Sequence, residues 1–176
     1  MGQYYVAIIL ADNDSKKAEI IKAYLESFGG SGQKLTEHSY IDNNFVNTFE
    51  FQLSKDGMFY KSRVVWAGDY ADKEIDSEKN LNEHTYELPD KSLNELRIPV
   101  KNTKEYRYII NHTKKQYVDK EKQYYHLLPL LTAEGNGRGG GDYSGDGEQF
   151  IGIWARDVIS VEKEVPEDYT KLECNF

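Results

Sequence analysis

The chain of 176 residues contains a single cysteine, Cys174, and only four prolines. One cysteine cannot form an intramolecular disulfide, which excludes a small secreted domain held by disulfides and favours a reducing compartment. No apolar run approaches the roughly 18 residues that a membrane helix requires. The first residues lack the basic lead of a signal peptide. We therefore expect a cytoplasmic protein with no membrane partner.

Aromatic residues are plentiful, with 14 tyrosines and 7 phenylalanines, and 39% of the chain is hydrophobic. Disordered chains are poor in aromatic residues, so this chain is expected to fold. Its length suits one domain that buries its own core. We predict a single domain spanning residues 1–176.

Short apolar runs bounded by turn residues predict strands at 6–10, 63–67, 106–111, Gln116–Asp119, 150–155 and 158–161. The arms 106–111 and Gln116–Asp119 are close enough to form a hairpin. Helices and strands do not alternate regularly along the chain. This order favours an α+β fold, a mostly antiparallel sheet with two or three helices packed on one face.

Helices are predicted in three places. Asn43 can cap a helix whose apolar face comprises Phe45, Val46, Phe49 and Leu53. Residues 20–28 also show helical spacing, although they can instead return as the second arm of a hairpin with 6–10. Residues 120–128 suit a short helix that ends at Pro129. The polar stretch 72–99 is expected to be a surface loop with at most a short helical turn.

The most unusual feature is a glycine-rich segment, residues 135–147, which holds seven of the fourteen glycines. Glycine lets backbone N–H groups converge on an anion, and Arg138 offers a bidentate contact to a phosphate or carboxylate. We therefore expect a small anionic, nucleotide-like ligand to bind Gly137, Arg138, Gly139, Gly140, Gly141, Asp142 and Tyr143.

Known phosphate loops match this segment poorly. The Walker and dinucleotide patterns require a helix after the loop, whereas here residues 150–155 form an apolar run of strand length. Asp142, Ser144 and Asp146 fit the first, third and fifth positions of a calcium-binding EF-hand loop, but Ile153 stands where the bidentate glutamate belongs. A surface loop without a ligand is the alternative that stays open.

Residues 101–126 form a basic segment with a net charge of +4 in a chain whose net charge is −8. The overall negative charge argues against nucleic acid as a partner. Tyrosines alternate with the cations, which is typical both of surfaces that bind aromatic ligands and of ordinary half-buried strands. We predict a ligand or protein-partner surface made of Tyr106, Arg107, Tyr108, Lys114, Lys115 and Tyr117.

No pair of the four histidines has metal-ligand spacing, and the lone cysteine cannot complete a zinc site, so no metal or other cofactor is expected. The pattern Glu-His-Ser/Thr-Tyr occurs at 37–40 and again at 83–86. Acid–base catalysis by His38 or His84 with its neighbouring glutamate is one hypothesis. The sequence has no known catalytic motif. A non-catalytic binding protein is therefore the leading hypothesis.

Several segments together resemble an uncharacterised protein family of phages and gut bacteria. They are the start Met-Gly-Gln-Tyr-Tyr, Glu-His-Ser-Tyr at 37–40, Val-Trp-Ala-Gly-Asp-Tyr at 65–70, Gly-Asn-Gly-Arg-Gly-Gly-Gly-Asp-Tyr at 135–143 and Trp-Ala-Arg-Asp at 154–157. The resemblance spans most of the chain but brings no activity, ligand or catalytic residue. It implies a phage or mobile-element origin, where small acidic proteins often inhibit host defences by binding. A protein inhibitor or adaptor that docks on a host enzyme is the alternative to ligand binding.

Overall fold

The structure, a computed structural model, describes residues 2–13, 16–28, 30–93, 100, 102–136, 143 and 145–176. The strands are β1 (Tyr5–Leu10), β2 (Ile21–Leu25), β3 (Ser62–Gly68), β4 (Tyr108–Asn111), β5 (Gln116–Asp119), β6 (Ala133–Glu134), β7 (Val158–Glu162) and β8 (Thr170–Lys171). The helices are α1 (Leu35–His38), α2 (Asn44–Gln52), α3 (Leu81–Thr85) and α4 (Leu127–Thr132), with 3-10 turns η1 (Pro89–Lys91) and η3 (Glu148–Phe150).

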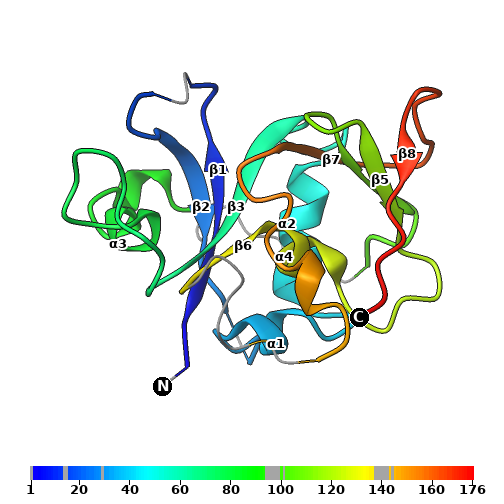
Figure 1. Ribbon diagram of the computed structural model, residues 1–176, viewed down its shortest axis with the longest axis horizontal. Helices are drawn as coiled ribbons and strands as arrows, with labels where there is room; N and C mark the ends of the chain where they lie inside the picture. The colour runs from blue at the N-terminus through cyan, green and yellow to red at the C-terminus, as the bar shows by residue number, and fades with distance from the viewer. Residues whose placement is uncertain are drawn as a thin grey trace.

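The strands form one sheet in the order β2-β1-β3-β7-β4-β5-β8, and β6 pairs with the end of β3. The β3–β6 and β5–β8 pairs are parallel, and the other pairs are antiparallel. Figure 1 shows strands β7 and β5 above α2 and α4, with α3 on the far side of β1 and β2. The predicted α+β class with a mostly antiparallel sheet is confirmed.

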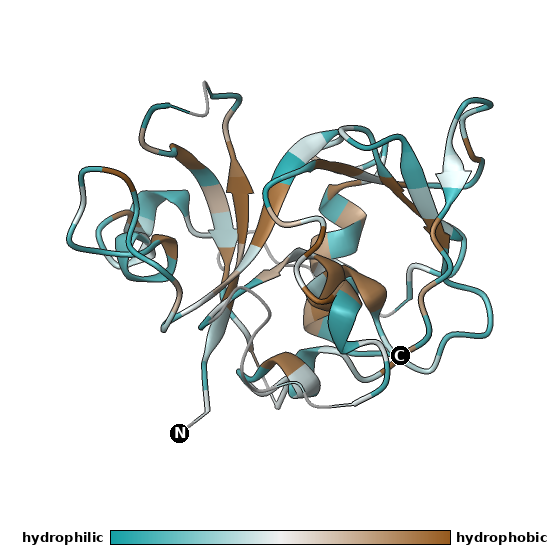
Figure 2. Cartoon of the chain, viewed as in Figure 1, coloured by the Kyte–Doolittle hydropathy of each residue, from teal (hydrophilic) through white to brown (hydrophobic). Residues whose placement is uncertain are grey.

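The main core lies where α2 and α4 pack on the sheet. Phe45 and Phe49 of α2 meet Trp66 of β3 edge to face, with ring centroids 5.4 and 5.1 Å apart. The predicted cap of α2 is correct, because the Asn43 side chain accepts from the backbone N–H of Phe45 at 2.9 Å. Figure 2 shows the hydrophobic residues gathered in β1, β3, β7 and α4. Of the described helices, none has the length and apolar character needed to span a membrane.

A second core on the opposite face corrects the prediction of two or three helices packed on one face, since the described residues form four α-helices and these cover both faces. Strand β1 is buried along its whole length, with Ala7 and Ile9 in the main core and Val6 and Ile8 in the second. A strand that is apolar on both sides requires cover on both. Leu81 of α3 covers the second face, so part of the predicted surface loop 72–99 is buried structure.

The helix predicted at 20–28 is wrong, and the hairpin alternative is correct. Strand β2 pairs antiparallel with β1, and its register shifts between Ile9 and Leu10. Because of this bulge, Ile21 and Tyr24 face the second core while Ala23 faces the main core. The bulge breaks the two-residue alternation of a strand, and the resulting spacing of apolar residues resembles that of a helix.

Two predictions in the C-terminal half are also wrong. The helix near Pro129 is α4, which begins at Leu127, and the proline lies in its first turn, where a backbone N–H has no helical acceptor. The strand predicted at 150–155 is a series of turns, because Gly152 and Trp154 donate their backbone N–H groups to carbonyls of α4. The predicted strands at 6–10, 63–67 and 158–161 and the β4–β5 hairpin are confirmed.

Candidate ligand-binding site

A cavity of about 470 Å³ opens between the end of α1, helix α2 and the loop that follows β5. Four cationic side chains line it, and we call it the basic cavity: Lys104, Arg107, Lys120 and Lys122. Its acidic lining residues are Asp42 and Glu121, and Glu121 already pairs with Arg107 at 2.7 Å. The wall of the cavity is thus cationic in a chain whose net charge is −8.

Beneath the cavity lies Glu50, a residue of α2 with no exposed surface. Its Oε2 atom accepts hydrogen bonds from the Thr103 hydroxyl at 2.6 Å and from Lys120 Nζ at 2.8 Å. Burial alone would raise the pKa of Glu50, but the Lys120 ammonium and the His126 imidazole outweigh burial and hold the pKa well below its ordinary value. The carboxylate is ionised and fixes the Lys120 ammonium at the cavity wall.

His126 joins the same cluster from the start of α4. It is 5% exposed, lines the basic cavity, and places its Nδ1 atom 3.6 Å from Oε1 of Glu50. Within the described part of the chain, neither His126 Nε2 nor Glu50 Oε1 has a hydrogen-bond partner. An unsatisfied buried polar atom costs about 1–3 kcal/mol. The cluster thus leaves two hydrogen-bonding atoms, one of His126 and one of Glu50, unsatisfied at the base of a cationic cavity.

The cavity has two further cations, Lys104 and Lys122. Both are exposed, and neither forms an ion pair with a described residue. Lys122 has a φ of 64°, in the left-handed region that non-glycine residues adopt at a cost. Arg107 is held at the mouth by Asp119, with Nε–Oδ1 and Nη2–Oδ2 distances of 2.8 and 2.6 Å. The cavity therefore combines two fixed cations with two that are available to a ligand.

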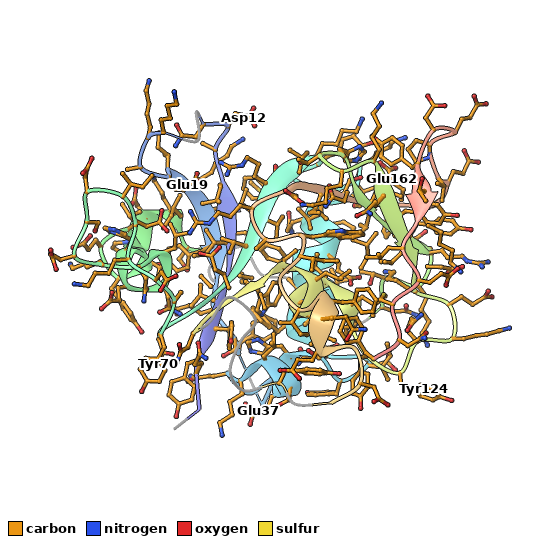
Figure 3. All side chains as sticks on the ribbon, in the orientation of Figure 1. Asp12, Glu19, Glu37, Tyr70, Tyr124 and Glu162 are labelled. Atoms are coloured by element: carbon orange, nitrogen blue, oxygen red, sulfur yellow. The ribbon has the colours of Figure 1, made fainter. Side chains whose placement is uncertain are left out.

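A second cavity of about 420 Å³, which we call the tyrosine cavity, adjoins the first. It is lined by Tyr124, Tyr125, Tyr143, Phe176 and four smaller residues, and Tyr125 lines both cavities. The rings of Tyr143 and Phe176 pack edge to face with centroids 6.0 Å apart. Figure 3 places Tyr124 at the periphery of the molecule, on the side away from Glu19.

The glycine-rich site predicted from the sequence lies almost wholly outside the described residues. Gly137, Arg138, Gly139, Gly140, Gly141 and Asp142 fall there. Tyr143 is described; it lines the tyrosine cavity and donates its hydroxyl to the Asp146 carbonyl at 2.8 Å. The end of the glycine-rich segment thus borders the cavity that shares Tyr125 with the basic cavity.

The six residues predicted as a ligand or partner surface are distributed over different parts of the fold. Tyr106 is buried in the main core, and its hydroxyl donates to Asp56. The rings of Tyr108 and Tyr117 pack against each other, 5.8 Å apart. Lys114 pairs with Asp157, and Lys115 has a φ of 52° in the β4–β5 turn. Of the six, Arg107 lines the basic cavity.

The two Glu-His pairs serve local structure. Glu37 and Glu83 each occupy the third position of a helix and accept from the backbone at its start, in α1 and α3 respectively. His38 is buried between Trp66 and Gly32, and His84 contacts Ser77 at 2.9 Å and Glu87 at 3.1 Å. The repeated sequence pattern coincides with two similar helix starts, at which each glutamate accepts from the backbone and each histidine contacts other groups.

Another cluster surrounds Arg156, which lines a cavity of about 430 Å³ beside Gly135. Its guanidinium contacts Glu74 and Glu134 through paired hydrogen bonds, and Glu19 lies 3.7 Å away. These carboxylates already occupy the guanidinium. The cluster therefore links distant segments and offers less to a ligand than the basic cavity does.

Sequence reasoning missed Glu50 and His126. A signal for Glu50 was present, since it falls on the same helical face as Val46 and Leu53, both of which are fully buried. A glutamate in an apolar stripe requires a cationic partner, which the structure supplies from the basic segment as Lys120.

No protein-family model, curated protein or solved structure matches the chain.

Proposed function

We propose that this chain is a non-catalytic binding protein for a small anionic, nucleotide-like ligand, and that the basic cavity holds the anion. The observation that carries the proposal is the cationic wall of that cavity, set over the buried Glu50–Lys120 pair. A volume of about 470 Å³ is in the range of small-molecule sites. Because the rest of the surface is acidic, a local cationic cavity concentrates anions there.

Preorganisation supports the same proposal. Lys120 Nζ also lies 3.1 Å from the Thr103 carbonyl, so three contacts from two residues hold the ammonium in place. These contacts use the three N–H donors of the ammonium, so Lys120 is a fixed part of the wall and direct hydrogen bonds to the anion come from Lys104 and Lys122. Asn47 and Gln123 add amide groups to the wall, which suits the oxygen atoms of a phosphate or a sugar.

The test is isothermal titration with inorganic pyrophosphate and adenosine 5′-monophosphate at low and at physiological salt. We expect binding that weakens with salt, and an affinity that falls about tenfold in each of Lys104→Gln and Lys122→Gln, since each removes one charge-assisted contact. Lys17→Gln, in the exposed turn after β1, is the matched control and should bind like the wild type. Equal affinity in all four proteins, or no binding to any probe, contradicts the proposal.

The glycine-rich segment enters this proposal as a second contact to the anion through Gly137, Arg138 and the residues up to Tyr143. What supports it is the position of Tyr143 in the wall of the tyrosine cavity. The phage or mobile-element origin implied by the sequence resemblance likewise belongs to the proposal and has no bearing on the choice of cavity.

A second candidate function is docking on a protein partner, as an inhibitor or adaptor of the anti-defence type. It is favoured by four exposed apolar side chains that lie together: Tyr40, Ile41, Tyr124 and Tyr125. Tyr40 and Tyr125 face each other in an isolated antiparallel bridge, which joins the patch across two segments. Exposed aromatic residues are frequent anchors of protein interfaces. Sedimentation of the chain with a candidate partner enzyme, before and after Tyr124→Ala, tests this function.

A further inference from the structure

The loop after β5 carries two kinds of side chain toward neighbouring cavities. Lys120 and Lys122 line the basic cavity, and Tyr124 lines the tyrosine cavity. Tyr125, the next residue, lines both. A single short loop therefore brings cations and aromatic rings together, which is the combination that recognises a charged group joined to a flat ring.

The aromatic part of this loop is poorly covered by the rest of the chain. Tyr124 is 82% exposed, and Tyr125 and its bridge partner Tyr40 are also exposed. A loop fixed at both ends carries these rings: Lys120 is bound to Glu50, and the backbone N–H of His126 donates to the Ser39 carbonyl at 2.7 Å. Fixed anchors around an exposed ring limit the entropy lost when a second ring stacks on it.

We propose that the tyrosine cavity is a ring-binding subsite in which a nucleobase stacks on Tyr124 and Tyr125 while the phosphate of the same nucleotide lies in the basic cavity. This inference rests on the proposed function and names its ligand class as a nucleoside phosphate. Tyr125 lines both cavities, which places the two subsites beside each other. Tyr143 closes the subsite from the end of the glycine-rich segment.

Charge and aromatic character favour this occupant over a second copy of the chain. Two copies that meet at this patch bring their cationic cavities close together, and like charges at an interface oppose association. A nucleotide satisfies both cavities at once, since its phosphate pairs with the lysines and its base covers the tyrosine rings. Stacking of one base on one aromatic side chain changes affinity by about 5- to 150-fold.

The experiment compares three probes by isothermal titration: inorganic phosphate, ribose 5-phosphate and adenosine 5′-monophosphate. The wild type should bind the nucleotide at least tenfold more tightly than ribose 5-phosphate. Tyr124→Ala should reduce that preference at least about fivefold and leave the affinity for ribose 5-phosphate unchanged, whereas Tyr124→Phe should keep the preference. Tyr86→Ala is the matched control, because Tyr86 is 76% exposed and lines neither cavity.

Two results overturn the ring subsite and leave the anion site standing: equal affinity of the wild type for ribose 5-phosphate and the nucleotide, or an unchanged preference in Tyr124→Ala. Failure of all three probes to bind overturns the ring subsite and the proposed function together. Sedimentation of the free protein supplies a further check. A wild-type dimer that Tyr124→Ala converts to monomer would assign the patch to a second copy of the chain and overturn the inference.

Discussion

The indole Nε1 of Trp66 donates a hydrogen bond to Nδ1 of His38 at 2.9 Å in the main core. An indole N–H can only donate, so Nδ1 of His38 carries a lone pair and the proton of the neutral ring is on Nε2. That Nε2 donates to the Gly32 carbonyl at 3.2 Å. The geometry thus determines both the tautomer and the neutral state of the imidazole.

The first prediction is a loss of stability as the pH falls from about 6.5 to 4. Burial lowers the pKa of His38 from 6.5 to about 4 in the folded chain. In this interval the unfolded chain binds a proton at His38 that the folded chain does not, so the stabilisation present above pH 6.5 disappears as the pH falls. Over the full interval the free energy of unfolding should fall by about 3 kcal/mol, which urea unfolding at a series of pH values can measure.

His38→Gln is the control for this prediction, because glutamine can accept from Trp66 and donate to Gly32 without titrating. Burial also lowers the pKa of His112, which adds a pH dependence of the same sign in both proteins. The difference between the two unfolding curves therefore isolates His38. Parallel pH dependence in the wild type and the variant would show that His38 does not control acid stability.

The second prediction concerns the pair under the basic cavity. Glu50→Gln leaves the Lys120 ammonium without its buried counter-charge and should lower the free energy of unfolding by about 3 kcal/mol. Lys120→Met should be destabilising by a similar amount, because it leaves Glu50 ionised and unpaired. The double variant should lose less than the sum of the two, with a coupling of about 1–3 kcal/mol in urea unfolding. Strict additivity would mean that the pair contributes nothing to folding.

The pH dependence of the same pair has a determined sign. The folded-state pKa of Glu50 is below its ordinary value of 4.5, so its contribution to stability is complete above that pH and is lost as the pH falls below it. Below pH 4.5 the wild type should therefore lose stability more steeply than Glu50→Gln. The free energies of unfolding of the two proteins should therefore converge in acid, and this convergence is what the experiment measures.

The parts of the fold that the sequence predicts are those set by neighbours in the chain. The apolar run of β1 and the cap and apolar face of α2, begun by Asn43, each depend on residues within one or two turns. Local propensity and periodicity carry this information directly. Strand β2 escaped prediction because a bulge opposite Ile9 and Leu10 changes its alternation, and a bulge depends on the partner strand.

The candidate site was predictable only in part. The sequence predicts a ligand or partner surface in the basic segment, but of the six residues named for it Arg107 is the one that lines the basic cavity. The decisive contact joins Glu50 to Lys120 across 70 residues of sequence. No local pattern contains that pairing, since it arises only when α2 and the loop after β5 pack together.

The third prediction tests the Arg156 cluster. Arg156→Lys should lower the free energy of unfolding by about 3 kcal/mol, because one ammonium cannot replace a guanidinium that contacts both Glu74 and Glu134 through paired hydrogen bonds. Arg107→Lys is the matched control, because the Arg107 guanidinium is also bidentate but 43% exposed. This variant should lose less than about 1 kcal/mol of the free energy of unfolding. Equal losses of unfolding free energy in the two variants, measured by urea unfolding, would show that burial of the Arg156 cluster does not add to its contribution to stability.

The fourth prediction concerns Arg138, the cation of the glycine-rich segment. If the segment reaches the bound anion as proposed, Arg138→Ala should weaken the binding of adenosine 5′-monophosphate about tenfold, the cost of one charge-assisted contact. Its free energy of unfolding should match that of the wild type. Combining Arg138→Ala with Lys122→Gln distinguishes one anion site from two. Losses that couple in titration indicate that both cations contact one phosphate, and losses that add indicate two separate anion sites. An unchanged affinity in Arg138→Ala confines the anion to the basic cavity and removes the glycine-rich segment from the site.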